Sequence, residues 1–310
     1  VGYDLEGIKS DKIDRFIESL KDASVTPQWN EYKNILKEIF PKDAEYIDNI
    51  PSKVCTSVTL STLHGCPPQE IERIASYLIV EKHLNTFVKC NPTILGYDFA
   101  RETLDNMGYD YISFDDRHFR EDLQYCDAVP MFTRLKALAE SKGLEFGLKL
   151  SNTFPVDVKA GELPSEEMYM SGKSLFPLTA EMANRISKQF NGKMRISYSG
   201  GADFFNIDKL FEAGIWPITV ATTILKPGGY NRLKQLAEKL ERCEFRPFDG
   251  VDCEKTDKIA KEAVRDIHYI KPVKPLPNRK INKAVPLTDC FIAPCKSGCP
   301  IGQDIPEYIE

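Results

Sequence analysis

The sequence predicts an α/β fold: a βα barrel of the TIM type that lacks its first strands, followed by a linker and the start of a second module. Short β-branched or aromatic runs alternate with amphipathic helical stretches over most of the chain, which is typical of βα units around a parallel sheet. A length of 310 residues suits one barrel, about 250 residues, with an appendage. Near the C-terminus the composition changes abruptly to prolines and cysteines.

The predicted elements follow that alternation in order. We predict strands at 56–60, 86–90, 109–114, 145–150, 194–198 and 217–221. The helices between them are expected at 68–81, 132–141, 179–190, 207–213 and 230–240. Six strands and an N-terminal stub fall short of the eight in a closed barrel, so we expect that part of the barrel lies upstream.

Two stretches interrupt the rhythm. Residues 10–51 are predicted to be helical, and residues 152–177 are rich in turn formers and acidic side chains. Long insertions after barrel strands usually lie over the active face, so the second stretch is either a lid or a surface excursion without ligand contacts.

Bulk composition excludes several classes of protein. A hydrophobic fraction of 42% and a charged fraction of 28% are ordinary for a soluble globular protein. No apolar run approaches the roughly 18 residues of a membrane helix, and the N-terminus has no signal-peptide pattern. A net charge of −5 gives no reason to expect nucleic acid. We therefore expect a cytoplasmic protein that acts on a small molecule.

The domain boundary is predicted in the proline-rich, basic segment KPVKPLPNRKINK. Residues 1–268 would form the barrel, 269–286 the linker and 287–310 the start of an iron-sulfur domain. Cys290, Cys295 and Cys299 lie within ten positions, and Pro300 follows the last one, which is iron-sulfur spacing. A structural zinc site is the rival hypothesis, but it favours paired two-residue spacings.

The remaining cysteines are scattered. Nine cysteines without a secretory signal indicate a reducing compartment. We interpret most of the scattered ones as small buried side chains: Cys55, Cys90, Cys126, Cys243 and Cys253.

Two successive strand-to-helix turns form a candidate phosphate site. One contains Gly200 and Gly201, and the next contains Thr222 and Thr223. Bare backbone N–H groups and helix N-termini at such turns bind phosphate in many barrels. The alternative is that the glycines only make tight turns.

Polar residues at two strand ends form a candidate cofactor site. Alternation places Lys89 and Lys149 opposite to their apolar neighbours, and each strand ends in an asparagine, Asn91 or Asn152. A lysine in a barrel mouth needs an anionic partner, which a flavin offers near N1 and C2. The alternative is a lysine that reaches water from the outer layer.

The loop STLHGCPP contains the candidate catalytic residues. Cys66 lies just before a predicted helix, where a lowered thiol pKa is expected, and it could deliver a proton opposite a flavin. His64 would orient Cys66 or bind a substrate anion. Both side chains could instead simply pack the loop.

Several stretches together resemble the selenate reductase subunit family, whose members are similar to dihydropyrimidine dehydrogenase and the small subunit of glutamate synthase. They are TLSTLHGCPPQEIE, LNTFVKCNPTILGY, EEMYMSGKSLFPL, ISYSGGADFF, ITVATTILKPGGY and DCFIAPCKSGCPIGQDIPEYI.

The resemblance implies a dihydroorotate-dehydrogenase-like barrel that binds FMN, followed by a domain with 4Fe-4S clusters and a domain for FAD and NAD(P)H. By motif, Lys89, Asn91, Lys149 and Asn152 would contact the flavin, Gly200, Gly201, Thr222 and Thr223 its phosphate, and Cys66 would occupy the catalytic loop. Related cluster domains have a cysteine three positions before Cys290, where this chain has Leu287.

Three functions compete. The first is a flavin and iron-sulfur oxidoreductase, with electrons relayed from NAD(P)H to a small substrate such as a nitrogen heterocycle. The second is a flavin-less scaffold that docks redox partner subunits, suggested by the acidic pair Asp115 and Asp116 after a strand. The third is a phosphate-binding enzyme with a Schiff base at Lys89 or Lys149.

Overall fold

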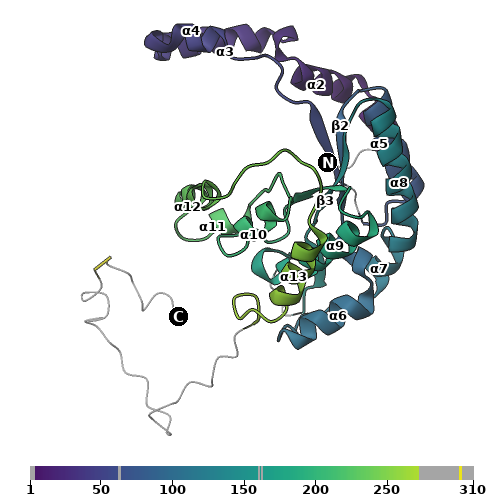
Figure 1. The fold of residues 1–310 in the computed structure, drawn as a ribbon. Coiled ribbons are helices and arrows are strands. Elements are labelled where there is room, and N and C mark those ends of the chain that lie inside the picture. Colours follow the sequence, from purple (N-terminus) through teal and green to yellow (C-terminus); the bar gives the residue numbers. More distant parts are fainter. Residues whose placement is uncertain (1–3, 62–63, 160, 162, 272–299, 302–310) are drawn as a thin grey trace. The chain divides into compact units, whose positions relative to one another are not determined.

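The computed structural model describes residues 4–61, 64–159, 161, 163–271 and 300–301 (Figure 1). The chain divides into two units, residues 1–272 and 273–310, and the architecture below is that of the first. None of its described helices combines the length and the apolar composition that crossing a bilayer requires.

A parallel sheet forms the centre of the first unit. Its strands are β1 (Ser57–Ser61), β2 (Asn85–Cys90), β3 (Phe146–Leu150) and β6 (Arg195–Tyr198), in that spatial order. Leu148, Ile196 and Tyr198 have essentially no exposed surface. Helices α5 (Pro68–Val80) and α8 (Tyr125–Ser141) lie side by side along the sheet (Figure 1), as expected for βα units.

Four of the six predicted strands are confirmed. The segment predicted at 217–221 is reduced to one parallel bridge between Tyr198 and Ile218. The strand predicted at 109–114 is wrong. There the amide of Ile112 bonds back to the carbonyl of Tyr109, and Arg101 donates to the Ile112 carbonyl at 2.7 Å. The backbone groups that a strand would offer are therefore used locally.

Four of the five predicted helices are confirmed to within three residues at each end, and the helix predicted at 132–141 begins seven residues earlier, at Tyr125. In chain order the helices and 3-10 turns are α1 (Leu5–Ile8), α2 (Asp11–Lys21), η1 (Ala23–Val25), α3 (Pro27–Ile39), η2 (Pro41–Asp43), α4 (Ala44–Asp48), α5, η3 (Pro92–Leu95), α6 (Tyr97–Asn106), α7 (Arg117–Glu121), α8, η4 (Gly172–Ser174), α9 (Phe176–Gln189), α10 (Ile207–Glu212), α11 (Thr222–Leu225), α12 (Asn231–Leu240) and α13 (Cys253–Ala263).

The N-terminal insertion is helical, as predicted, and ion pairs connect its helix α2 to the end of α5. Lys82, which follows α5, is 9% exposed and pairs with Asp14 and Glu18 of α2. The two carboxylates neutralise a lysine that would otherwise be a costly buried charge.

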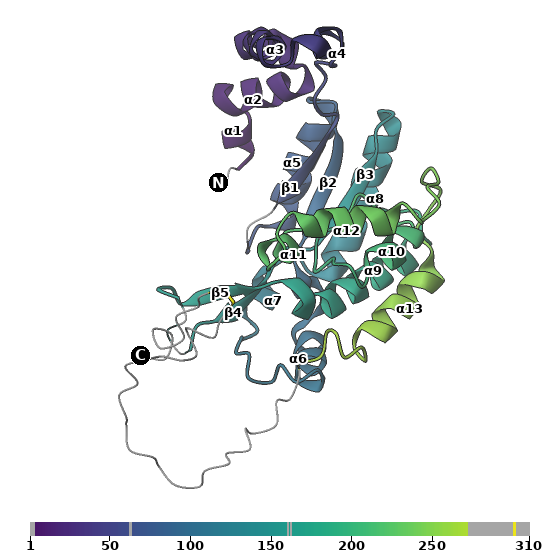
Figure 2. The same ribbon diagram turned by 90° about the vertical axis from the view of Figure 1, so that its left-hand side faces the viewer.

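The second insertion contains an antiparallel hairpin of β4 (Phe154–Asp157) and β5 (Glu167–Met170), visible in Figure 2. Phe154 is fully buried and Met170 is 9% exposed, and both belong to the main core. The base of this segment is thus packed into the main core, and its role as a lid stays a prediction.

Of the five scattered cysteines that were predicted to be buried, only Cys90 is. Cys90 is buried, and Cys55, Cys243 and Cys253 are partly exposed, but Cys126 is exposed. Cys126 lies in the first turn of α8, and its neighbour Ala128 fills the core position instead. All the cysteines in the described part of the chain are free thiols.

Candidate active site

Two lysines lie next to each other at the carboxyl ends of the central strands. Lys89 of β2 is in register with Lys149 of β3. The row continues to Ser61 of β1 and to Ser197 of β6. Partners in register project to the same face of a parallel sheet, so the four side chains lie in a line across it. We call these four residues the lysine row.

The two lysines lack an acidic partner within the described residues. Both side chains are half-buried. Burial lowers the pKa of Lys89, and burial together with the nearby charge of Lys89 lowers the pKa of Lys149. Two adjacent, partly desolvated ammonium groups repel each other, so the row favours an anionic or electron-rich ligand.

The two predicted asparagines connect neighbouring strands just beyond the lysines. Asn152 donates from Nδ2 to Oδ1 of Asn91 at 2.5 Å, and its backbone amide donates to the Cys90 carbonyl at 3.0 Å. The Ser61 hydroxyl donates to Oδ1 of Asn152 at 3.4 Å. These bonds hold the ends of β1, β2 and β3 together beside the lysine row.

Asp122 lies at the centre of this site and was not predicted from the sequence. Its carboxylate is 4% exposed and accepts four hydrogen bonds. The donors are Nδ1 of His64 at 2.7 Å, the Gly65 amide at 2.8 Å, Nδ2 of Asn91 at 3.0 Å and Oγ1 of Thr93 at 2.6 Å. We call these five residues the Asp122 hub.

Ionisation of Asp122 is maintained by its partners. Burial alone would raise the pKa of this carboxyl, but the hydrogen bonds from His64, Thr93 and Gly65 outweigh it and lower the pKa. A charged Asp122 therefore fixes the loop that carries His64 and Gly65 against the end of β2. No motif in the sequence marks Asp122, which is 58 positions from His64.

Cys66 follows the hub in the chain. Burial, and then the negative charge of Glu70, raise the pKa of its thiol, contrary to the lowered pKa expected before a helix. The thiol lines a small cavity of about 10 Å³ together with Lys89, Asn91 and Asp122, which is room for about one water molecule. Cys66 is thus a protonated thiol that faces both the hub and the lysine row.

The predicted phosphate turns come together at a third loop. A Cβ on Gly201 would lie 2.3 Å from the Gly172 carbonyl oxygen, and one on Gly172 would lie 2.9 Å from Cγ2 of Thr222. A Cβ on Gly200 would lie 2.1 Å from Oγ1 of Thr179. Close packing accounts for both glycines of the first turn, and the phosphate role stays a prediction.

The other predicted residues fall into three groups. Thr222 contacts the hydroxyl of Ser171 at 3.2 Å, whereas Thr223 is buried. Cys290, Cys295 and Cys299 lie outside the described residues. The acidic pair is engaged locally, because Asp116 accepts from Arg120 and Asp115 accepts from the Arg117 amide.

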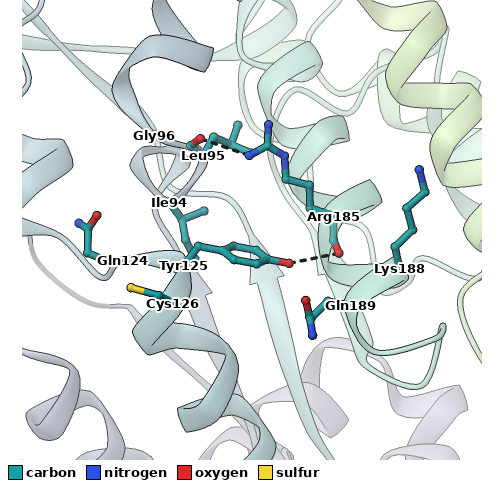
Figure 3. A pocket seen from close by; sticks show the side chains of 9 residues that line it. All are labelled: Ile94, Leu95, Gly96, Gln124, Tyr125, Cys126, Arg185, Lys188 and Gln189. Carbon is teal, nitrogen blue, oxygen red and sulfur yellow. Dashed lines mark hydrogen bonds between the residues drawn. The ribbon is translucent and has the colours of Figure 1, made fainter.

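A pocket of about 710 Å³ lies elsewhere on the barrel, between η3 and the helices α8 and α9 (Figure 3). Its two cationic side chains are already paired, Arg185 with Glu181 at 2.9 Å and Lys188 with Asp257 at 2.5 Å. Neither the lysine row nor the Asp122 hub lines it. We therefore assign the candidate active site to the strand ends.

The parallel sheet with polar residues at its strand ends is the arrangement of a TIM-barrel domain, and the comparison with family models agrees. Residues 1–271 match the family model described as "Oxidoreductase YgfK, N-terminal TIM-barrel domain". The chain belongs to this family of YgfK N-terminal TIM-barrel domains.

The curated relatives are longer than this chain. The "Putative oxidoreductase YgfK" of Escherichia coli strain K12 is 45% identical over 325 aligned positions, which span 100% of this chain and 32% of the relative. The protein from Escherichia coli O157:H7 gives the same values. The chain thus spans about a third of the length of the curated relatives that it matches.

Among solved structures, two dihydroorotate dehydrogenase (DHODH) structures from Eimeria tenella are similar at a low level. The ligand-free enzyme has a TM-score of 0.32 at 14% identity and covers 60% of each chain. The complex with ferulenol has a TM-score of 0.30 at 16% identity and covers 60% of this chain and 67% of the other. At these scores the likeness carries no argument for function.

Proposed function

We propose that this chain is the flavin-binding barrel of an NAD(P)H-linked oxidoreductase that also contains FAD and 4Fe-4S clusters. The barrel would reduce or oxidise a small organic substrate, such as a nitrogen heterocycle. The observation that carries the proposal is the lysine row, in which two half-buried ammonium groups meet without an acidic partner among the described residues.

FMN fits the chemistry of the row. Its ring supplies hydride and electron transfer when bound, and it gains negative charge near N1 and C2 on reduction. Lys89 and Lys149 would stabilise that charge, and the amides of Asn91 and Asn152 would hydrogen-bond the ring. The turns at Gly200, Gly201, Thr222 and Thr223 would hold the phosphate, since they meet at Gly172.

Cys66 would act as the acid. The raised pKa keeps its Sγ protonated at neutral pH, so the thiol can donate that proton to a substrate atom and recover one from water. In this proton transfer the Asp122 hub would position the loop that carries Cys66, because it fixes His64 and Gly65 in that loop.

The remaining parts of the proposal concern the tail and the partners. Cys290, Cys295 and Cys299 would ligate a 4Fe-4S cluster that relays electrons to the barrel. The FAD and NAD(P)H sites and any redox partner subunits would belong to the rest of the longer protein.

The pKa values of the lysines favour a second candidate function. A lysine whose pKa is lowered by burial and by a neighbouring cation is a better nucleophile at neutral pH, as in Schiff-base enzymes. Lys149 would then attack a substrate carbonyl and release water, without a flavin.

The test is cofactor content and binding. FMN should copurify with the full-length protein under anaerobic conditions, and the chain itself should bind added FMN. Lys149→Met should weaken FMN binding about tenfold to a hundredfold, because a charged hydrogen bond contributes about 1.5–3 kcal/mol. The exposed Lys258→Met is the matched control. FAD and clusters without FMN would favour a scaffold, and a borohydride-trapped adduct at Lys149 would favour the Schiff base.

A further inference from the structure

Two histidines beside the candidate active site are each held by a carboxylate. Nδ1 of His64 bonds to Oδ2 of Asp122 at 2.7 Å, and Nε2 of His118 bonds to Oε1 of Glu167 at 2.8 Å. The ring centroids are 4.6 Å apart. These contacts bring together the His64 loop, helix α7 and strand β5, which lie far apart in the sequence.

One nitrogen of this group has no partner. Nδ1 of His118 is buried and makes no hydrogen bond within the described part of the chain. In a neutral imidazole whose Nε2 donates to Glu167, the lone pair is on Nδ1, and a buried acceptor without a donor is costly. A bound cation would use that lone pair.

A third ligand lies within reach. One ligand atom from each of His64, His118 and Asp122 lies within 4.8 Å of the others, so small rotations would bring all three to one centre. We propose that these three residues bind a divalent metal ion of the zinc type. One or more positions on the metal would remain for water or for an oxygen or nitrogen atom of a substrate.

The surroundings have the features of an outer ligand shell. In metal sites the second ring nitrogen of a ligating histidine usually donates to a carboxylate, as His118 does to Glu167. Ligating carboxylates are themselves hydrogen-bonded, as Asp122 is by Gly65 and Thr93. Arg117 also pairs with Glu167, which leaves that carboxylate to orient His118 rather than to bind the metal.

The donor set selects the kind of metal. Two imidazoles and one carboxylate suit Zn²⁺ and neighbouring transition metals, whereas Mg²⁺ and Ca²⁺ prefer oxygen ligands alone. None of the three ligands belongs to the lysine row, so metal binding can be measured without flavin.

The test is metal binding by the whole chain without added flavin. The tail cysteines would also bind zinc, so the starting variant carries Cys290→Ser, Cys295→Ser and Cys299→Ser. After removal of metal by a chelator, Zn²⁺ is titrated in competition with a chromophoric chelator, and Co²⁺ is followed by its visible absorption. We expect one equivalent of each metal per chain.

Substitutions assign the ligands. His118→Gln should lower the Zn²⁺ affinity at least a hundredfold, and Glu167→Gln should lower it about tenfold to a hundredfold as an outer-shell change. The control is the exposed His83→Asn, which keeps a side chain that tolerates the positive φ of 53° at that position. Far-ultraviolet circular dichroism and the urea midpoint verify that each variant is folded.

The possible outcomes are distinct. Loss of the single equivalent in folded His118→Gln, with normal binding by His83→Asn, supports the site. The proposal is overturned if the chain with the three serine substitutions binds no equivalent, or if binding is unchanged in folded His118→Gln and His64→Gln variants. Binding that depends on Cys66 alone would overturn it as well.

Discussion

The Asp122 hub and the lysine row lie at the same edge of one sheet, yet their polar groups are paired in opposite ways. The buried Asp122 carboxylate accepts four hydrogen bonds. Lys89 and Lys149 are half-buried and have no acidic partner among the described residues. The difference separates two tasks: the hub fixes loop geometry, and the row keeps charge available for a ligand.

The largest expected effect comes from breaking the hub. Asp122→Ala removes the acceptor of four donors, so it should lower the free energy of unfolding by about 3 kcal/mol or more. Urea unfolding in the presence of a chelator measures it. The exposed Asp110→Ala should change stability by less than about 0.5 kcal/mol. Equal small losses in both variants would show that the hub does not hold the loop.

The second-largest effect on stability is expected at the turn that contains Gly201. Gly201 has φ of 84°, and a Cβ there would lie 2.3 Å from a backbone oxygen, whereas Gly143 has φ of 68° with open space around it. In both alanine variants the left-handed conformation should lower the free energy of unfolding by about 1–2 kcal/mol. Gly201→Ala should cost clearly more than Gly143→Ala in urea unfolding. Similar losses of unfolding free energy in the two variants would mean that the turn at Gly201 can move away from the neighbouring backbone oxygen. A turn that can move in this way would favour the binding of a phosphate there.

Sequence reasoning found both lysines of the row but not Asp122, the centre of the hub, for a physical reason. Strand alternation marks Lys89 and Lys149, and four of six strands appear where β-branched runs predicted them. Lys89 lies directly beside Lys149 because of how β2 pairs with β3, and no local sequence pattern predicts that pairing. Asp122 lies in a short stretch between α7 and α8 without a motif, and only folding brings it to His64.

The failed strand at 109–114 shows the same limit. The run YDYISF is rich in aromatic and β-branched residues, as strands often are, but Arg101 donates to the carbonyls of Tyr109 and Ile112 and the segment turns. The hydroxyl of Tyr109 also donates to the Tyr269 carbonyl at 2.7 Å, a contact 160 positions away. Local pattern gives the element type only where no distant side chain competes for the backbone.

A smaller effect on stability tests whether Lys149 lacks a compensating negative charge. The pKa of Lys149 is lower in the folded chain than its ordinary value of 10.5, so the unfolded chain binds the proton more tightly. This lysine therefore destabilises the fold below the lowered pKa, and the penalty fades as the pH rises toward 10.5. Lys149→Met should stabilise the flavin-free chain at pH 7, by less than about 1 kcal/mol because water screens a half-exposed charge.

The pH dependence distinguishes this cause from simple packing. The gain from Lys149→Met in urea unfolding should shrink between pH 7 and pH 10, and Lys258→Met should show no such trend. A gain that is constant with pH would mean that the methionine packs better and that the charge of Lys149 is already compensated.

The smallest effect concerns Cys66, which faces both regions. Because the thiolate is the reactive form and the pKa of Cys66 is raised, iodoacetamide should modify Cys66 more slowly than the exposed Cys126 at pH 8, by about tenfold. Peptide mapping by mass spectrometry after timed quenching gives both rates from one sample. Glu70→Gln should speed the modification of Cys66 modestly, since the charge of Glu70 is the second cause of the raised pKa after burial. Faster modification of Cys66 than of Cys126 would show that the strand-end site holds a thiolate, and the proton donor would then have to be another group.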